Sequence, residues 1–158
     1  MSKKRRLVRE KVLQALYAYE FSKNDPEVVA EDVLSELKGD KEQHAFAKTL
    51  FLKAISSGKE LDALIKLKVE HWEFSRLAVI DKLILRMAIA EILFFDDIPP
   101  KVSINEAIEI ARDFSTVKSD KFVNGVLDSV LDSLKKSGKL SKTGRGLLDH
   151  SLNEKQAP

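Results

Sequence analysis

The sequence predicts an all-helical protein of about six to seven helices. Apolar residues recur every three to four positions through most of its 158 residues, which is the spacing of one helix face. No stretch alternates apolar and polar side chains with β-branched enrichment, so no strand is predicted. Since 44% of the residues are hydrophobic in a chain of this length, we expect one domain with a sizeable core.

Two helices are predicted at the N-terminal end. Residues 4–21 carry apolar side chains at helical spacing and form the first. Asn24-Asp25-Pro26 begins the second, because Asn or Asp caps a helix and proline favours its first position. Gly39 ends it.

A third helical region and a central helix follow. The third spans residues 46–69; we expect Ser56-Ser57-Gly58 to break it and Trp72 to close it. Residues 74–95 leave almost no polar face, which is typical of a helix surrounded by others. The charges of Arg86 and Glu91 in this apolar helix must be paired, and Glu106 or Glu109 is the expected partner of Arg86.

Two more amphipathic helices complete the predicted core. Pro99 and Pro100 end the central helix, because each proline disfavours the helical conformation of its predecessor. The segment from Ser103 to Glu106 fits a capping box at the start of the next helix. Apolar stripes over residues 104–114, which include Phe114, and over 123–134 are both expected to be buried. We therefore expect a helical domain over residues 1–136 and a basic, flexible tail over 137–158.

The composition excludes several classes of protein. There is no cysteine, hence no disulfide framework or thiolate metal site. The N-terminus lacks the apolar run of a secretory signal, and no apolar stretch has the roughly 20 residues needed to span a bilayer. A cytoplasmic location is expected. The ends are basic, +5 over residues 1–11 and +4 over 135–158, while the middle sums to −7, which favours an anionic ligand and a basic partner.

Motifs for catalysis are missing. The three histidines are scattered, without metal-ligand spacing, and no phosphate-binding glycine loop or nucleophile elbow is present. The carboxylates fall on predicted helix surfaces or caps, where structural roles are usual. We therefore expect a protein that is not an enzyme and that needs no cofactor or metal.

A cluster of cations in the first predicted helix is the main functional signal. Arg5 and Arg9 are four residues apart and Arg6 and Arg9 three, so their guanidinium groups can grip neighbouring phosphates. A basic run that only confers solubility is the alternative, and the cluster by itself does not separate the two. Its members are Lys3, Lys4, Arg5, Arg6, Arg9 and Lys11.

Phe122 is a second candidate contact for nucleic acid. Lys118 and Lys121 bracket it, and an aromatic ring beside cations is a common platform for an unpaired base. A buried, structural phenylalanine is the alternative. Gly125, which is unfavourable within a helix, indicates close approach of a neighbouring helix or of RNA.

Five motifs follow one another in the chain between about residue 5 and residue 131. They are Arg9 with Gln14-Ala15-Leu16-Tyr17, Trp72, the segment from Asp81 to Glu91, the segment from Val102 to Glu109, and the segment from Lys121 to Asp128. The last two are the most specific in combination. With these motifs the chain resembles the NusB transcription antitermination family.

The resemblance implies a fold of two small helical bundles packed into one domain. It implies binding to the single-stranded boxA element of nascent rRNA leader transcripts, a heterodimer with the basic ribosomal protein NusE, and a place in the antitermination complex on RNA polymerase. The family's RNA contacts fall on Arg5, Arg6, Arg9 and Phe122, and its NusE contacts on Tyr17 and Asp81.

Some features lie outside this resemblance. The family varies at Lys118, and its core has no counterpart of the basic tail. A helical protein-interaction module remains an alternative function, as does a domain related to the N-terminal extensions of RNA methyltransferases. The sequence leaves open whether the free protein is a monomer or a homodimer.

Overall fold

The computed structural model describes residues 2–147, apart from the side chains at positions 2, 3 and 71. This part of the chain contains eight α-helices and no strand, which confirms the all-helical prediction. In chain order the elements are α1 (Ser2–Ser22), α2 (Pro26–Val33), η1 (Ser35–Leu37), α3 (Lys41–Ser56), α4 (Gly58–Lys66), α5 (His71–Arg76), α6 (Val79–Phe94), α7 (Pro100–Phe114), α8 (Ser119–Lys136) and η2 (Gly144–Leu147), where η marks a 3-10 helix.

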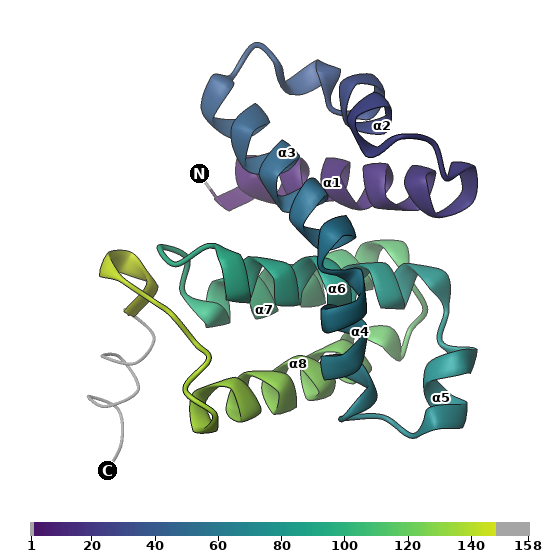
Figure 1. Ribbon diagram of the computed structural model, residues 1–158, viewed down its shortest axis with the longest axis vertical. Coiled ribbons are helices and arrows are strands. Elements are labelled where there is room, and N and C mark those ends of the chain that lie inside the picture. The colour runs from purple at the N-terminus through teal and green to yellow at the C-terminus, as the bar shows by residue number, and fades with distance from the viewer. Residues whose placement is uncertain (1, 148–158) are drawn as a thin grey trace.

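The helices form two layers, and α6 lies where the layers meet (Figure 1). α1, α2 and α3 make the upper layer in this view, and α6, α7 and α8 make the lower one. α6 contacts α1 and α3 above it and α4, α7 and α8 around it, so one hydrophobic core joins both layers. Ten of its sixteen residues are buried, which confirms the predicted central helix.

Several predicted boundaries are confirmed. Asp25 caps α2 by accepting a hydrogen bond from the backbone N–H of Glu27, and Pro26 occupies the first turn. α3 ends at Ser56 and α4 begins at Gly58, at the predicted break.

The predicted helix over 74–95 is two helices. Leu77 and Ala78 have extended backbone, with ψ of 139° and 142°, so α5 ends at Arg76 and α6 starts at Val79. Apolar spacing does not reveal such a break, because Leu77 still packs against the core from its extended position. The prediction that Trp72 closes the preceding helix is also wrong, since Trp72 lies in α5 and is 61% exposed.

The predicted capping box is wrong as well. α7 begins at Pro100, three residues before Ser103, because proline suits the first helical position. Ser103 and Glu106 are therefore inside the helix and buried, where they have other partners.

A buried ion pair joins α1, α6 and α7. The Nε and Nη2 atoms of Arg9 donate to the two carboxylate oxygens of Glu91 at 2.9 and 2.6 Å. The Ser103 hydroxyl donates to Glu91 Oε1 at 2.8 Å. Arg9 and Glu91 are 3% and 1% exposed, so both charges are withdrawn from water and depend on each other. We call these three residues the Arg9 clip.

Arg86 is paired as predicted, but not with the predicted residues. Its Nε and Nη2 atoms donate to Asp62 of α4 at 2.7 and 2.9 Å, and its Nη1 lies 3.7 Å from a carboxylate oxygen of Glu20. Glu106 instead binds Arg6, and Glu109 binds Arg112.

Residues 139–147, which we call the C-terminal strap, fold back against the turn between α6 and α7. The backbone N–H of Thr143 donates to the carbonyl of Asp96 at 3.0 Å, and Lys142 Nζ donates to the carbonyl of Phe95 at 2.8 Å. The predicted flexible tail therefore does not describe these residues, and the rest of it, 148–158, lies outside the described residues. None of the described helices is long and apolar enough to cross a membrane.

Candidate RNA and partner interface

The cations of α1 are each paired with a carboxylate from another element. Lys4 lies 2.5 Å from Asp40, Arg5 3.5 Å from Glu42, and Lys11 2.9 Å from Glu36. Arg6 contacts Glu106 of α7 through Nε at 2.5 Å and Nη2 at 3.3 Å. The basic N-terminus that the sequence displays is therefore largely neutralised within the fold. The side chain of Lys3 lies outside the described residues.

Arg9 does not share this surface. The prediction that it contacts RNA conflicts with its burial in the Arg9 clip, where a phosphate would have to displace Glu91 from the protein interior. Sequence spacing placed Arg5, Arg6 and Arg9 together because they share one side of the helix. That side of α1 packs against α3, α6 and α7, so Arg9, one turn after Arg5 along the helix, is buried in the core.

Arg5 lies at the edge of that core. Its guanidinium carbon is 4.0 Å from the centroid of the Phe46 ring of α3, close enough for a cation–π contact. Burial and then the neighbouring Arg9 lower the pKa of Arg5, while Glu42, Glu91 and Asp97 oppose the shift. The sequence held no signal for Phe46, because the contact spans 41 positions of the chain.

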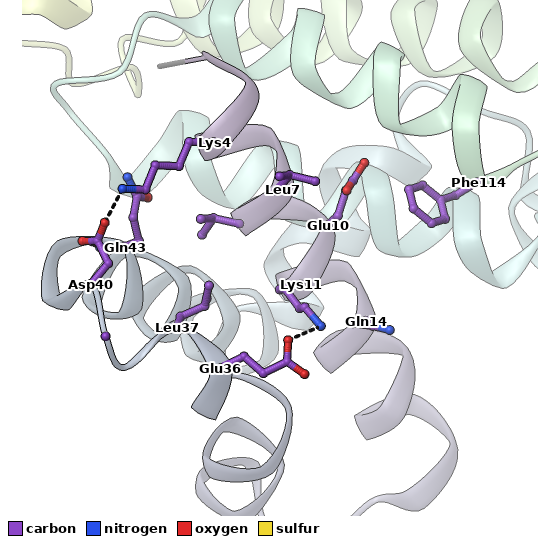
Figure 2. Close-up of a pocket in the computed structure, with 12 residues that line it drawn as sticks. Lys4, Leu7, Glu10, Lys11, Gln14, Glu36, Leu37, Asp40, Gln43 and Phe114 are labelled. Atoms are coloured by element: carbon purple, nitrogen blue, oxygen red, sulfur yellow. Dashed lines mark hydrogen bonds and ion pairs between the residues drawn. The ribbon is translucent and has the colours of Figure 1, made fainter.

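An apolar groove of about 650 Å³ runs along the outer side of α1 (Figure 2). Leu7 and Leu37 line it, and Lys4 and Lys11 are held toward Asp40 and Glu36 on its far wall. Phe114 lies at its other side and is 52% exposed, contrary to the prediction that this residue is buried.

Lys118, Lys121 and Phe122 lie at the start of α8. Both lysines are exposed and make no salt bridge with any residue the structure describes, unlike the cations of α1. The intervening Asp120 is engaged by Arg112, which, with the backbone N–H of Lys121, lowers the pKa of that carboxyl. Two exposed cations without carboxylate partners therefore flank the ring.

Phe122 itself is half-buried and packs against the core. The residue as a whole is not fully buried, so a packing role and a stacking role are compatible. Gly125, in the next turn of α8, is exposed, and a Cβ built there would meet no atom within 4 Å. The predicted close approach of a neighbouring helix is therefore wrong.

α7 lies between the two groups of cations, with α1 on one side and α8 on the other (Figure 1). Its exposed turns carry carboxylates as well as Arg112. Burial, reinforced by Asp113 of α7, raises the pKa of Glu10 on the facing side of α1. The two groups of cations are thus separated by an acidic stretch, and no described contact joins them directly.

Tyr17 and Phe21 form an exposed aromatic pair near the C-terminal end of α1. Their ring centroids are 4.7 Å apart, and the residues are 44% and 63% exposed. They lie three to four turns from the Lys4–Arg6 segment on the same helix. Exposed aromatic residues are typical of protein interfaces, and Tyr17 also offers a hydroxyl to a partner.

Asp81, predicted to contact the same partner, is 8% exposed. Its two carboxylate oxygens accept hydrogen bonds from the Ser115 hydroxyl at 2.6 Å and the Ser119 hydroxyl at 3.1 Å. Asp81 therefore fastens the turn between α7 and α8 to the first turn of α6. The carboxylate that we expected to contact a partner protein is therefore buried, and both of its oxygens accept hydrogen bonds within this protein.

Together these features define an all-helical protein with cations and exposed aromatic rings on its surface. Among the described residues no group of three or more histidine or acidic side chains is arranged to hold a metal. Residues 6–132 match the model of the NusB family. The chain belongs to the NusB family.

Curated relatives support this membership over nearly the whole chain. The transcription antitermination protein NusB of Chloroherpeton thalassium is 47% identical over 154 residues, covering 92% of this chain and 69% of the relative. The protein of the same name from Salinibacter ruber is 42% identical, covering 97% of this chain and 96% of the relative.

Solved structures share the fold. T. maritima NusB superposes with a TM-score of 0.75 at 40% identity, over 81% of this chain and 90% of that chain. A crystal structure described as the antitermination factors NusB and NusE in complex with dsRNA has a TM-score of 0.74 at 24% identity, over 84% and 99%, which shows the fold alone.

The location of Asp81 predicts a loss of stability on substitution. Asp81→Ala leaves the buried Ser119 hydroxyl without its carboxylate acceptor, so the free energy of unfolding should fall by about 1–3 kcal/mol in urea denaturation. Asp128→Ala, which removes an exposed carboxylate of α8, is the matched control and should change it by less than about 0.5 kcal/mol. Equal stability of the two variants, with partner binding lost only in Asp81→Ala, would restore Asp81 to the interface.

Proposed function

We propose that this protein is a transcription antitermination factor that binds the boxA element of nascent rRNA leader transcripts together with NusE. It then joins the antitermination complex on RNA polymerase. Its role is binding and assembly, not catalysis. Membership of the NusB family supports this role, and the relatives named transcription antitermination protein NusB support it further.

Lys118, Lys121 and Phe122 carry the RNA-binding part of the proposal. An exposed cation without a carboxylate partner can bind a phosphate without losing an existing ion pair. The Phe122 ring then offers a surface on which an unpaired base can stack. A single strand suits this arrangement, since stacking requires a base that is not paired.

The cations of α1 extend the RNA path through exchange of partners. Exposed ion pairs contribute about 0–1 kcal/mol, so the Lys4–Asp40 and Arg5–Glu42 pairs can yield to phosphate at small cost. Arg6 uses Nε and Nη2 on Glu106. Its planar guanidinium retains the Nη1 donors for a further acceptor.

NusE is proposed to bind the exposed pair Tyr17 and Phe21. A basic protein suits a chain whose residues 12–134 sum to −7. Asp81 acts only indirectly, by fixing the turn that presents Lys118. The aromatic pair and the α1 cations lie at opposite ends of one helix, so RNA and NusE can be bound at the same time.

The RNA contact is tested first by Phe122→Leu, which retains an apolar side chain but removes the stacking surface. Affinity for boxA RNA in a fluorescence anisotropy titration should fall about five- to hundredfold, since stacking contributes about 1–3 kcal/mol per base. Phe21→Leu, which alters an exposed ring of the other surface, is the control and should bind RNA as the unmodified protein does.

The salt dependence of RNA affinity tests the number of cations that contact phosphates. Five cations (Lys4, Arg5, Arg6, Lys118 and Lys121) should yield a slope of log affinity against log salt of about −3.5 for a single strand, and Lys118→Ala with Lys121→Ala should reduce it by about 1.4. Binding without salt dependence and without preference for boxA over a scrambled RNA would refute the assignment.

The partner surface is tested by Tyr17→Asp. A charge placed among exposed aromatic contacts should weaken binding to NusE at least tenfold in isothermal titration calorimetry, because an unpaired carboxylate would be desolvated in the interface. Leu67→Asp, at an exposed leucine just after α4, is the matched control. If both variants bind NusE equally well, the Tyr17 surface is not the interface.

A further inference from the structure

The C-terminal strap lies beyond the part of the chain that matches the NusB family. The family match ends at residue 132, and the strap comprises residues 139–147. Between Ser133 and Leu147 the chain carries five basic residues and no acidic one. This segment has no part in the surfaces described above.

Two glycines direct the strap back onto the protein. Gly138 has a φ of 72°, and Lys139 N–H donates to the carbonyl of Leu134 at 3.0 Å, which ends α8 in a Schellman-like turn. Gly144 has a φ of 53° at the start of η2. Both values lie in the left-handed region that favours glycine.

The strap is docked through its backbone and through one lysine. Thr143 and Lys142 bind the carbonyls of Asp96 and Phe95, and Leu140 packs against the core. Gly146 is buried so close to the Asp96 carbonyl that a Cβ at this position would overlap the oxygen atom. Only glycine permits this approach, so the docking depends on residue 146.

The docked strap is linked to the N-terminal end of α1 through Phe95 and Phe46. Phe95, whose carbonyl Lys142 binds, packs its ring on Phe46 with centroids 5.1 Å apart. The guanidinium of Arg5 also lies against the Phe46 ring, 4.0 Å from its centroid. Figure 1 agrees, since η2 lies at the edge of the molecule where α1 and α7 begin.

Lys139 and Arg145 are the cations that the strap leaves available. Both are exposed, and neither forms a salt bridge among the described residues. Asp96 and Asp97 are the exposed carboxylates of the turn beneath. The strap thus adds two unpaired cations. Arg145 lies in the part that docks on the turn between α6 and α7, and Lys139 lies at the other end of the strap, just after α8. The described cations at the start of α1 are, by contrast, paired.

We propose that the C-terminal strap is an additional RNA-binding element, in which Lys139 and Arg145 hold the phosphates of the strand that continues past Arg5. The element rests on the proposed function, because RNA must first bind α1. Its ligand is the sugar–phosphate backbone, so it adds affinity without adding sequence preference.

The test uses the full chain and two RNAs, boxA alone and boxA extended at either end. Lys139→Ala with Arg145→Ala should weaken binding of the extended RNA on the order of tenfold in low salt and reduce its salt slope by about 1.4, for two lost phosphates. Binding of boxA alone should change much less. Lys59→Ala with Arg76→Ala removes two exposed, unbridged cations elsewhere and is the matched control.

Gly146→Ala tests whether RNA binding requires the docked conformation of the strap or only its positive charge, because this substitution displaces the strap and alters no charge. It should also weaken binding of the extended RNA; Thr143→Pro, which removes the N–H bound to Asp96, should do the same. Unchanged RNA affinity in the charge variant, or in both docking variants, would overturn the inference. If Phe122→Leu and the Lys118→Ala, Lys121→Ala variant also bind RNA like the unmodified protein, the proposed function fails too, which keeps the two failures distinct.

Discussion

The Arg9 clip is the interaction on which the rest of this structure depends. Arg9, Glu91 and Ser103 come from α1, α6 and α7, and their hydrogen bonds are satisfied only when these helices are in register. Removing one partner of such a buried pair typically destabilises a protein by about 3–5 kcal/mol, because the remaining charge is left unpaired. The clip therefore fixes how α1 is rotated against the core, and so how deeply each of its cations is buried: Arg9 fully, Arg5 and Arg6 in part, and Lys4 not at all. The positions of the cations that we propose for RNA binding follow from a contact that RNA does not touch.

The distribution of charge in this protein is determined by local ion pairs and is not visible in the net charge. The net charge is only +2, and the described cations of α1 are each neutralised by a carboxylate from another element. The exposed pairs of Lys4 and Arg5 are weak and easily exchanged, whereas the buried pair that holds Arg9 is not. Unpaired cations are left at the start of α8 and in the C-terminal strap. In the function we propose, RNA replaces the carboxylates of Lys4 and Arg5 with its phosphates and also contacts the unpaired lysines and arginine.

Periodicity predicted the helices well, because apolar spacing is a local property that the core selects directly. Apolar periodicity did not predict the contacts between residues that are far apart in the sequence. Arg9 and Arg5 share a helix face, yet only the packing of α6 decides that the former is buried. Asp81 looked like a surface carboxylate because Ser115 and Ser119, its hydrogen-bond donors, lie 34 and 38 positions away. The strap looked like a flexible tail because its docking uses backbone atoms and one glycine, which leave no apolar pattern.

15N NMR of the arginine side chains during an RNA titration measures whether the Arg9 clip stays closed when RNA binds. The prediction is that the Nε–H of Arg9 exchanges slowly with water and that its signal does not move as boxA RNA is added, while the signals of Arg5 and Arg6 shift in proportion to the fraction bound. A signal of Arg9 that exchanges rapidly and shifts in step with that of Arg6 would contradict it, because the clip would then be open to RNA.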